Sequence, residues 1–392
     1  MPKLLQINVT SNWGSTGKIA EQIGVLAQQQ GWDCYMAYGR YANPSQLKTI
    51  KIGSKLDVYR HYVENRFLDR EGLSSQNATR VFLKQLDDIK PDVVHLHNIH
   101  DHFLNYQVLF EYLNQTNIKI VWTFHDCWAF TGHCYHFILE NCMKWQTECG
   151  DCVIRNKFVD RSRENYLLKK QLFSTNKNLT IVSCSNWMGD LVKHSFFKDK
   201  RIKVIHNGID INTFIPISGA KTNDGKFRII AVSNVWLPYK GLNDIFKLRD
   251  ILSDEFEIIM VGLAKKQIKI LPIGIRGIIR TQDIHELIQL YNMADVLINP
   301  TYADTFPTVN LEALACGTPV ITYKTGGSPE AVDHKTGIVV EQGNVTALAN
   351  AIMEMKQHPL SSNDCRKRAE DYFNKDKCFE EYVKLYNELI NN

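Results

Sequence analysis

The chain has 392 residues, of which 44% are hydrophobic and 22% charged, and its formal net charge is +4. A chain of this length rarely folds around a single hydrophobic core, so we expect two domains. The apolar runs stay below the roughly 20 residues that cross a bilayer. The sequence has no Lys/Arg-rich tract with interleaved aromatic residues, which is the pattern that indicates nucleic-acid binding.

The first half of the chain alternates short apolar runs with helical periodicity. A loop at residues 12–18 precedes a helix expected at 19–30, and another helix begins near residue 105. This alternation predicts βα units that build a parallel sheet. Strands are expected at residues 4–9, 34–38, 93–97, 118–124, 179–183 and 203–205.

The same pattern restarts in the second half. Residues 213–226 contain Pro216, Gly219 and Gly225 without periodicity, which indicates a linker. Strands are expected at residues 227–232, 256–261, 275–279, 296–299 and 320–323, and helices at 347–358 and 376–389. We therefore predict an α/β protein with two Rossmann-like parallel-sheet domains, at residues 1–212 and 227–375.

Two carboxylates flank a loop in the segment DTFPTVNLEALACGTPV, residues 304–320. Asp304 follows an expected strand, and Glu312 lies eight residues later in an Ala/Leu-rich helical segment that ends near Gly317. This arrangement places both at the carboxyl edge of a parallel sheet, where open α/β sheets bind ligands. Helix N–H groups attract phosphate and carboxylates accept hydrogen bonds from sugar hydroxyls, so the segment predicts a nucleotide-sugar site.

The same segment resembles the acidic-x7-acidic signature of the retaining family-4 glycosyltransferases, which have the GT-B fold. In that family the pattern usually starts with Glu and runs into ACGTPV, whereas here the first member is Asp304. The resemblance extends over almost the whole chain. It implies two Rossmann-like domains that face each other across a cleft, with the nucleotide mainly on the second domain. It also implies that the terminal helix, residues 376–392, packs back on the first domain.

For the donor, the resemblance implies a role for each residue of this segment. Glu312 is expected to accept hydrogen bonds from the ribose hydroxyls, and Asp304 to contact the donor sugar in a catalytic role. The backbone near the sugar and phosphate is expected to come from Thr305, Phe306, Pro307 and Thr308.

Lys240, in the segment WLPYKGL, follows the first strand of the second domain. A Lys in such a loop can reach a diphosphate as a point charge, and the family resemblance implies this catalytic and donor-binding role. The family also has an Arg five residues before this Lys, where this chain has Val235. Arg280 or Lys324 could supply the missing contact, and a solvated surface Lys is the alternative for Lys240.

A glycine loop, Gly14-Ser15-Thr16-Gly17-Lys18, precedes the first helix. A Walker P-loop needs four residues between its glycines and a Ser or Thr after the Lys, so we exclude a nucleoside triphosphatase. A tight loop before a helix N-terminus still suits phosphate. The family resemblance makes Gly14 and Gly17 candidate donor-binding residues, with a simple strand–helix turn as the alternative.

Histidines cluster at two expected strand ends of the first domain. His125 lies in TFHDCWAFTGHC, which resembles family-4 enzymes that build bacterial surface polysaccharides, and we predict a catalytic role for it. His97 and Asn98 lie in HLHNIHDH and are predicted to bind the acceptor, whereas His95 is expected in the core. A metal site at this second cluster is the less favoured interpretation.

Four of the ten cysteines gather in an expected insertion at about residues 127–155. The CxxC spacing at the end of this cluster lets two thiolates meet one tetrahedral zinc ion. In a reducing compartment, clustered cysteines are more often a metal site than disulfides. We predict a structural zinc, with free buried thiols and disulfides as the alternatives. The four candidate ligands are Cys134, Cys142, Cys149 and Cys152.

Residues 155–173 are basic and partly amphipathic, which suits either an acidic membrane surface or a solvated helix face. The first ten residues lead into a strand pattern without a signal-peptide core. We therefore expect a cytoplasmic protein, which would meet lipid-linked acceptors as a peripheral protein at the inner face of the cytoplasmic membrane.

These features together predict a retaining glycosyltransferase. It would move a sugar from a UDP- or GDP-type donor to a saccharide or lipid-linked saccharide acceptor in cell-surface polysaccharide assembly, such as that of lipopolysaccharide or capsule. The family resemblance implies that catalysis needs no metal cofactor. The alternatives are a non-catalytic sugar-nucleotide-binding subunit and a GT-B nucleotide-sugar epimerase or phosphorylase.

Overall fold

The computed structural model describes residues 1–154 and 158–391. Residues 155–157, where the expected cysteine insertion ends and the basic segment begins, lie outside the described part. The chain forms two compact units. The N-terminal unit comprises Met1–His206 together with Cys378–Asn392, and the C-terminal unit comprises Asn207–Lys377. The segment 213–226 lies within the C-terminal unit.

The N-terminal unit is built on a seven-stranded parallel sheet of order β3-β2-β1-β4-β5-β6-β7. Apolar side chains bury both faces of its inner strands, because helices cover the two faces. The strands are β1 (Lys3–Asn8), β2 (Asp33–Tyr38), β3 (Lys48–Lys51), β4 (Val93–Leu96), β5 (Lys119–Phe124), β6 (Leu179–Ser183) and β7 (Arg201–Val204). The helices are α1 (Gly14–Gln29), α2 (Lys55–Leu68), α3 (Gln76–Ile89), α4 (Tyr106–Leu113), α5 (Ser162–Thr175), α6 (Asn186–Lys193) and α13 (Lys375–Asn391).

The C-terminal unit has a six-stranded parallel sheet of order β10-β9-β8-β11-β12-β13. Two all-parallel sheets with covering helices confirm the predicted fold class. The strands are β8 (Phe227–Val232), β9 (Phe256–Val261), β10 (Ile275–Ile278), β11 (Val296–Asn299), β12 (Val320–Tyr323) and β13 (Gly337–Val340). The helices are α7 (Leu242–Ile251), α8 (Lys265–Ile268), α9 (Ile284–Met293), α10 (Thr308–Ala315), α11 (Val345–Gln357) and α12 (Ser362–Tyr372).

Helix α1 begins at Gly14 rather than at residue 19, so the expected loop at 12–18 was too long. Gly14 has φ +67°, a backbone conformation that L side chains rarely adopt and that starts the helix directly after Trp13. Gly17 lies in the first turn, where a Cβ atom would come 2.6 Å from Thr10 Oγ1. Both glycines therefore have a structural reason for their place: one forms the turn and the other permits close packing.

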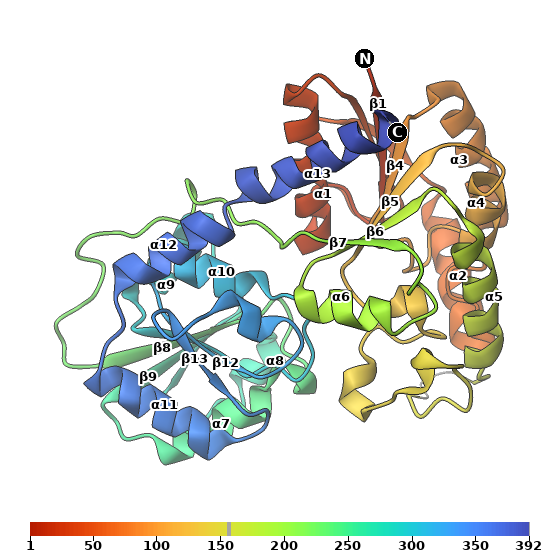
Figure 1. Cartoon of the computed structure of the whole chain (residues 1–392). Helices are drawn as coiled ribbons and strands as arrows, with labels where there is room; N and C mark the ends of the chain where they lie inside the picture. The colour runs from red at the N-terminus through yellow and green to blue at the C-terminus, as the bar shows by residue number, and fades with distance from the viewer. Residues whose placement is uncertain (155–157, 392) are drawn as a thin grey trace. The chain divides into compact units, whose positions relative to one another are not determined.

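Helix α13 completes the core of the N-terminal unit. Its buried side chains recur every three to four residues, and they pack against α1, β1 and β2 and the first residue of β4. Two of its tyrosines also reach buried polar groups of the sheet: Tyr386 Oη lies 2.6 Å from His95 Nδ1, and Thr123 Oγ1 donates to Tyr382 Oη over 3.2 Å. Figure 1 shows α13 beside α1.

The tyrosine contact predicts a stability effect. Tyr386→Phe removes the hydroxyl donor of a fully buried imidazole, which leaves His95 Nδ1 without this partner. Such a loss costs about 1–3 kcal/mol, or about 2–4 °C in melting temperature per kcal/mol for a unit of this size. Thermal unfolding followed by tryptophan fluorescence measures it. The exposed Tyr59→Phe is the matched control, and equal melting temperatures for both variants would contradict the prediction.

Candidate functional site

The strand order of the C-terminal sheet reverses between β8 and β11. From β8 the chain continues to β9 and β10 on one side, and it then returns to place β11 on the other side of β8. The loops that follow β8 and β11 therefore lie at the point of the carboxyl edge where open α/β sheets bind ligands. Lys240 lies in the first of these loops and Asp304 in the second.

The two loops meet through an ion pair. Lys240 Nζ lies 2.7 Å from Asp304 Oδ2 and donates a longer hydrogen bond, of 3.3 Å, to the carbonyl of Ala303. Their backbones are also joined, because Tyr302 N donates to Tyr239 O over 2.7 Å. The two charged side chains keep 24% and 20% of their surface exposed, so a ligand can reach them.

Glu312 lies on α10, one turn beyond the start of the helix. Its Oε2 accepts a 2.7 Å hydrogen bond from the hydroxyl of Tyr291, which is fully buried. Burial, with the adjacent Glu312, raises the pKa of Tyr291 well above its ordinary value, so this phenol stays a donor. The hydrogen bond fixes the orientation of the carboxylate. The sequence did not indicate this partner, which lies 21 residues upstream on α9.

The loop before α10 brings the other predicted donor-binding residues to the same place. Pro307 is the N-cap and Thr308 the first helical residue, and no side chain caps this end of the helix. Thr305, Phe306 and Pro307 are buried, whereas Thr308 is half-buried. The first N–H groups of α10 therefore follow directly after the loop that carries Asp304 and have no side-chain cap. Uncapped N–H groups at a helix N-terminus suit an anion.

The position expected to hold an Arg is Val235, which is exposed. Of the two proposed substitutes, Arg280 lies beyond β10, an edge strand that is two strands away from β8. Lys324 follows β12 and forms an exposed ion pair with Glu341 over 3.1 Å. The structure therefore brings together Lys240 and Asp304 but adds neither substitute to them.

The N-terminal sheet has the same kind of reversal, between β1 and β4. Gly14 and Gly17 follow β1, whereas His97 and Asn98 follow β4. The two loops are tied together, because Asn98 N donates to Asn8 Oδ1 over 3.1 Å. The sequence-predicted residues of both groups therefore share one edge of this sheet, the edge expected to bind ligands.

His97 and His125 form a hydrogen-bonded pair whose direction follows from its neighbours. Gln6 Nε2 donates to Ala20 O over 2.8 Å, so Gln6 Oε1 faces His97 Nε2, 3.0 Å away. The amide oxygen therefore accepts a hydrogen bond from His97 Nε2–H. His97 Nδ1 is then an acceptor, and it receives the hydrogen bond from His125 Nε2 over 3.1 Å. This order assigns the tautomers of both rings.

Burial keeps both imidazoles neutral near pH 7. It lowers the pKa of His125 to about 4, against an opposing effect of Asp126. The pKa of His97 also falls well below its ordinary value, because of burial and the neighbouring His95 and His125. A neutral imidazole can orient a hydroxyl group, but it adds no positive charge to the site.

A second polar network of the N-terminal unit was not foreseen. His100 Nε2 lies 2.8 Å from Asp126 Oδ2, and Arg40 Nη1 lies 2.6 Å from Asp101 Oδ2. Burial lowers the pKa of His100 and Asp126 raises it, with a net shift upward. Asp101 and the following His102 have φ values of 75° and 73°, unusual for residues other than Gly. The HDH sequence was visible, but nothing in the sequence pointed to its partner Arg40.

The four cysteines of the predicted metal site gather in the segment between β5 and α5. They line one small cavity together with His133, which sequence analysis had not singled out. His133 is hydrogen-bonded to Asp69, 64 residues upstream, and no local pattern links these two positions.

Comparison with known proteins identifies the family. The model of glycosyl transferases group 1 matches residues 216–372, and the model of glycosyltransferase family 4 matches residues 19–213. The chain belongs to the family-4 glycosyltransferases. The two matched segments together account for most of the chain, so this assignment does not depend on one motif.

Relatives of this glycosyltransferase agree with its fold. The putative colanic acid biosynthesis glycosyl transferase WcaC of Escherichia coli (strain K12) is 24% identical over 415 residues, which cover 98% of this chain and 100% of WcaC. Sucrose-phosphate synthase from Thermosynechococcus elongatus superposes with a TM-score of 0.77 at 17% identity, over 100% of both chains. Anabaena Alr3699/HepE in complex with UDP gives 0.70 at 15% identity, over 99% of this chain and 100% of HepE. These structures confirm the GT-B fold.

Within residues 1–154 and 158–391, no helix of this glycosyltransferase combines the length and the apolar character that crossing a bilayer requires.

The neutral histidines predict that acid destabilises the N-terminal unit. Unfolded His has a pKa near 6.5, so below about pH 6.5 the unfolded chain binds more protons than the folded one. His125, with its folded pKa of about 4, therefore contributes stability that is complete above pH 6.5 and is lost as the pH falls toward 4. The free energy of unfolding should fall by up to about 1.4 kcal/mol for each pH unit in this range because of His125.

Urea midpoints at pH 7, 6 and 5 measure this dependence. His125→Gln should flatten the decline, and the exposed His358→Gln in the C-terminal unit should not change it. The pair His100–Asp126 acts in the opposite direction, because its His has a raised pKa. A decline as steep in His125→Gln as in the parent protein would refute the assignment.

Proposed function

We propose that this glycosyltransferase moves a sugar, with retention of anomeric configuration, from a UDP- or GDP-type nucleotide sugar to a saccharide or lipid-linked saccharide in cell-surface polysaccharide assembly. The observation that supports it most is the ion pair Lys240–Asp304 between the loops that follow β8 and β11, directly before the N-terminus of α10, which no side chain caps. The names of two similar proteins agree with it: WcaC is described in colanic acid biosynthesis, and HepE was solved with UDP.

Lys240 is the group that would neutralise the leaving diphosphate. Breaking a glycosyl–phosphate bond leaves negative charge on the phosphate oxygens, and a fixed positive charge nearby stabilises that charge as it develops. Its partner Asp304, at 2.7 Å, holds the ammonium group in place before a donor binds. Lys240 and the N–H groups of α10 would then serve where other enzymes use a divalent cation, so the mechanism uses no metal.

Asp304 is the group that would hold the donor sugar. A carboxylate accepts hydrogen bonds from hydroxyl groups, and one that already contacts a Lys can keep one oxygen for each task. Asp304 is one methylene shorter than the Glu that usually starts this motif. Because the backbone of its loop is bonded to Tyr239, the loop brings the shorter side chain within reach of Lys240.

Glu312 is the group that would bind the ribose. Its carboxylate lies on α10 beyond the phosphate-compatible N-terminus, and the hydroxyl of Tyr291 orients it from below. A ribose presents two neighbouring hydroxyls, which a fixed carboxylate can accept together. Tyr291 acts here as a positioning residue, because its hydroxyl donates to Glu312.

In the N-terminal unit, His125 would orient a sugar hydroxyl and His97 with Asn98 would bind the acceptor. The pair His97–His125 is neutral, so it offers direction and hydrogen bonding rather than charge. Gly14 and Gly17 lie at the start of α1, where N–H groups suit phosphate oxygens. None of these groups is a strong base near pH 7, which fits front-face attack with the leaving phosphate taking the acceptor's proton.

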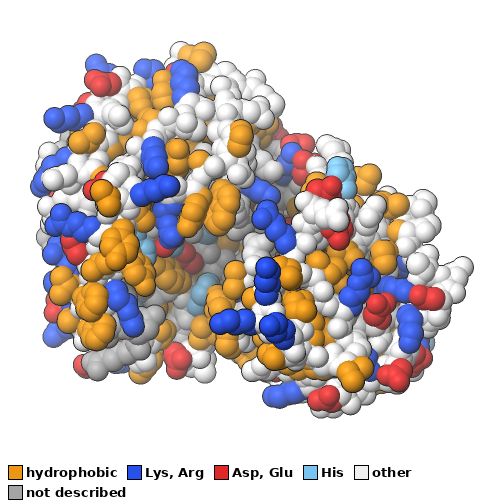
Figure 2. Space-filling model, turned by 180° about the vertical axis from the view of Figure 1, so that it is seen from behind, with side chains coloured by type: hydrophobic (Ala, Val, Ile, Leu, Met, Phe, Trp, Pro, Cys, Tyr) orange, Lys and Arg blue, Asp and Glu red, His pale blue; other side chains and the backbone are white. Residues whose placement is uncertain are grey.

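A surface on α2 would hold the enzyme at a membrane that presents a lipid-linked acceptor. The helix exposes large apolar side chains next to Lys55, Arg60 and Arg66. Figure 2 shows orange side chains next to blue ones on this face of the N-terminal unit. Such a mixture suits the interface of an anionic bilayer. The apolar side chains are Leu56, Tyr59, Tyr62, Phe67 and Leu68.

The segment predicted for this role, residues 155–173, is less suitable where it is described. Its helix α5 turns a stripe of buried residues to the core. Lys169 belongs to this stripe and donates to Trp128 O over 2.7 Å and to Thr131 O over 3.1 Å. The amphipathic pattern of α5 therefore reflects packing within the unit.

Donor binding is the first test of the proposed function. We expect one class among UDP, GDP and their sugars to raise the melting temperature, because a ligand at 100 times its Kd stabilises the native state by about 2.7 kcal/mol. Glu312→Ala should abolish the shift. Lys240→Ala should retain much of the binding and lower kcat by about 10²–10³, the usual effect of removing one transition-state charge contact.

The matched controls are Glu354→Ala and Lys247→Ala. Both residues are exposed and lie on helices α11 and α7 of the C-terminal unit, outside the loops that carry Lys240 and Asp304. Product NMR decides between retention and inversion. Binding of a nucleotide sugar without transfer to any saccharide would favour the non-catalytic subunit, and an altered free donor would favour an epimerase. Full activity in Lys240→Ala would remove the central argument.

Vesicle binding tests the surface on α2. The double variant Tyr62→Ser/Phe67→Ser should bind anionic phosphatidylglycerol vesicles at least about tenfold more weakly, since burying one such side chain contributes about 1.5–3 kcal/mol. Ile273→Ser, which removes the almost fully exposed Ile273 of the C-terminal unit, is the control. Sedimentation with vesicles measures the effect, and equal binding of all three proteins would exclude α2 as the membrane surface.

A further inference from the structure

The four clustered cysteines line one small cavity. Their segment connects β5 to α5, and the side chains line a cavity of ≈ 20 Å³ that also contacts His133. This volume holds about one water-sized sphere. Apolar groups such as Phe137 and Trp145 form much of the remaining lining. The four lining cysteines are Cys134, Cys142, Cys149 and Cys152, and all are free thiols in the structure.

The turn between the last two cysteines is held in a fixed shape. Lys144 Nζ donates to the carbonyls of Gly150 and Asp151, over 2.8 and 3.0 Å. The backbone N–H of Gly132 donates to Cys149 Sγ over 3.3 Å. The same N–H group would donate to the sulfur of a metal-bound thiolate. The CxxC turn thus has the shape and the donors of a thiolate pair that binds a metal.

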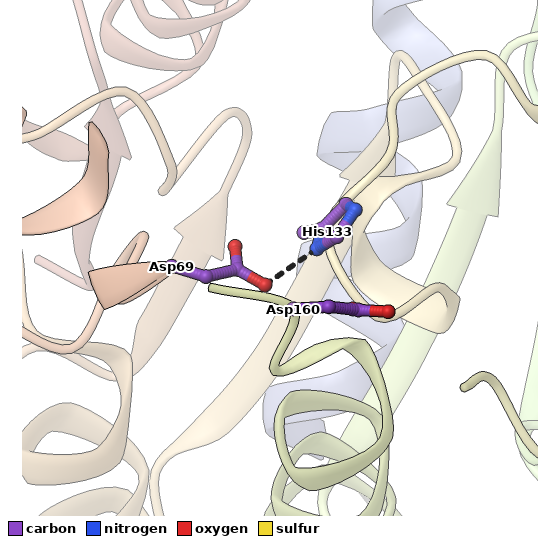
Figure 3. A group of neighbouring side chains, drawn as sticks. All are labelled: Asp69, His133 and Asp160. Atoms are coloured by element: carbon purple, nitrogen blue, oxygen red, sulfur yellow. Dashed lines mark hydrogen bonds and ion pairs between the residues drawn. The ribbon is translucent and has the colours of Figure 1, made fainter. Parts of the chain in front are cut away.

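A carboxylate–histidine pair stands directly behind the cysteines. His133 Nδ1 lies 2.8 Å from Asp69 Oδ2, and His133 Nε2 lies 3.2 Å from Cys152 Sγ. Figure 3 shows the first of these contacts as a dashed line. Asp69 is fully buried and also accepts from Arg161 N over 2.9 Å. At metal sites a carboxylate partner of this kind fixes the orientation of the histidine ring, and here the ring faces the sulfur of Cys152.

Asp69, His133 and Asp160 do not themselves make a site for a hard cation, although their ligand atoms lie within 4.8 Å of one another. Asp160 Oδ2 accepts from Cys152 N over 2.7 Å, and its Oδ1 accepts from Ser162 N over 2.9 Å. Both oxygens of Asp160 and Oδ2 of Asp69 therefore already accept hydrogen bonds from N–H groups. His133 and Asp160 contact Cys152, so this group of side chains stabilises the cysteine segment.

We propose that Cys134, Cys142, Cys149 and Cys152 bind one Zn²⁺ ion as four thiolates, with Asp69 and His133 positioning Cys152. Thiolate sulfur is the ligand type that selects zinc among common cellular cations, and four of them complete a closed tetrahedral site. Each thiol gives up its proton to solvent as its Zn–S bond forms, and no electron is transferred.

The ion would fix a segment that starts beside the proposed acceptor residues. Cys127, two residues after His125, donates its N–H to Tyr135 O over 3.0 Å, within the same segment. The hydroxyl of Tyr135 donates to Glu71, and the side chain of Trp145 is buried under the cysteines. Small loop-rich segments of this kind often need a metal to supply the stability that their apolar contacts lack.

Metal analysis of the purified protein tests the site without reference to activity. Protein isolated under reducing conditions should contain one zinc ion per chain by mass spectrometry. Chelation should make four additional thiols reactive toward a thiol reagent. Cobalt substitution should give the strong visible bands of a tetrahedral four-thiolate site. Cys149→Ser should lose the metal, whereas Cys365→Ala, which changes a buried cysteine of the C-terminal unit, should keep it.

Two results would overturn the proposal. One is a parent protein that contains no zinc and takes up none when Zn²⁺ is added to the reduced form. The other is stoichiometric zinc in Cys149→Ser, which would place the ion elsewhere. The thiol and cobalt measurements use the parent protein, so they remain decisive if a Cys→Ser variant fails to fold.

His133 has its own test, because it is assigned a positioning role. His133→Ala should weaken zinc affinity by about 10–100-fold, while the stoichiometry and the cobalt spectrum stay those of four thiolates. A cobalt spectrum that changes its ligand-field pattern in His133→Ala would show that the imidazole itself binds the ion, and it would refute the four-thiolate set.

Discussion

Parallel pairing of all the described strands is the constraint on which both candidate sites depend. It sends the carboxyl end of each strand to one edge of its sheet, and the strand order of each sheet reverses once along that edge. At the reversal, neighbouring loops diverge and leave backbone groups unpaired by the sheet. Lys240 and Asp304 occupy one such place, and His97 occupies the other. Helix packing and side-chain orientation add detail to an arrangement that strand order has already set.

The two edges differ in their electrostatics, and burial is the reason. Lys240 and Asp304 keep part of their surface in water, so the pair can exchange partners with a charged ligand. His97 and His125 are enclosed, and removal from water lowers their pKa values until they are neutral. One edge therefore suits a phosphate group and the other suits uncharged hydroxyls.

Sequence alone predicted much of this, for a physical reason. Inner parallel strands are buried on both faces and appear as continuous apolar runs, so β8, β9 and β11 have the predicted bounds. The edge strands β3 and β13 were missed because β3, of sequence KTIK, is mostly exposed and β13 is buried only at its first and last residues. The partners Tyr291 and Asp69 were also missed, since tertiary contacts between distant positions leave no periodicity to detect.

Helix α13 gives the chain an unusual order of assembly during synthesis. The ribosome releases residues 378–389 after the whole of Asn207–Lys377, although they fill the core of the N-terminal unit. Asn207–Lys377 is by then complete and holds its own sheet and core. Domains generally fold in the order in which they emerge. Here the core of the N-terminal unit stays incomplete until residues 378–389 emerge, so a nascent chain stalled before residue 378 exposes to chaperones the apolar side chains that α13 covers.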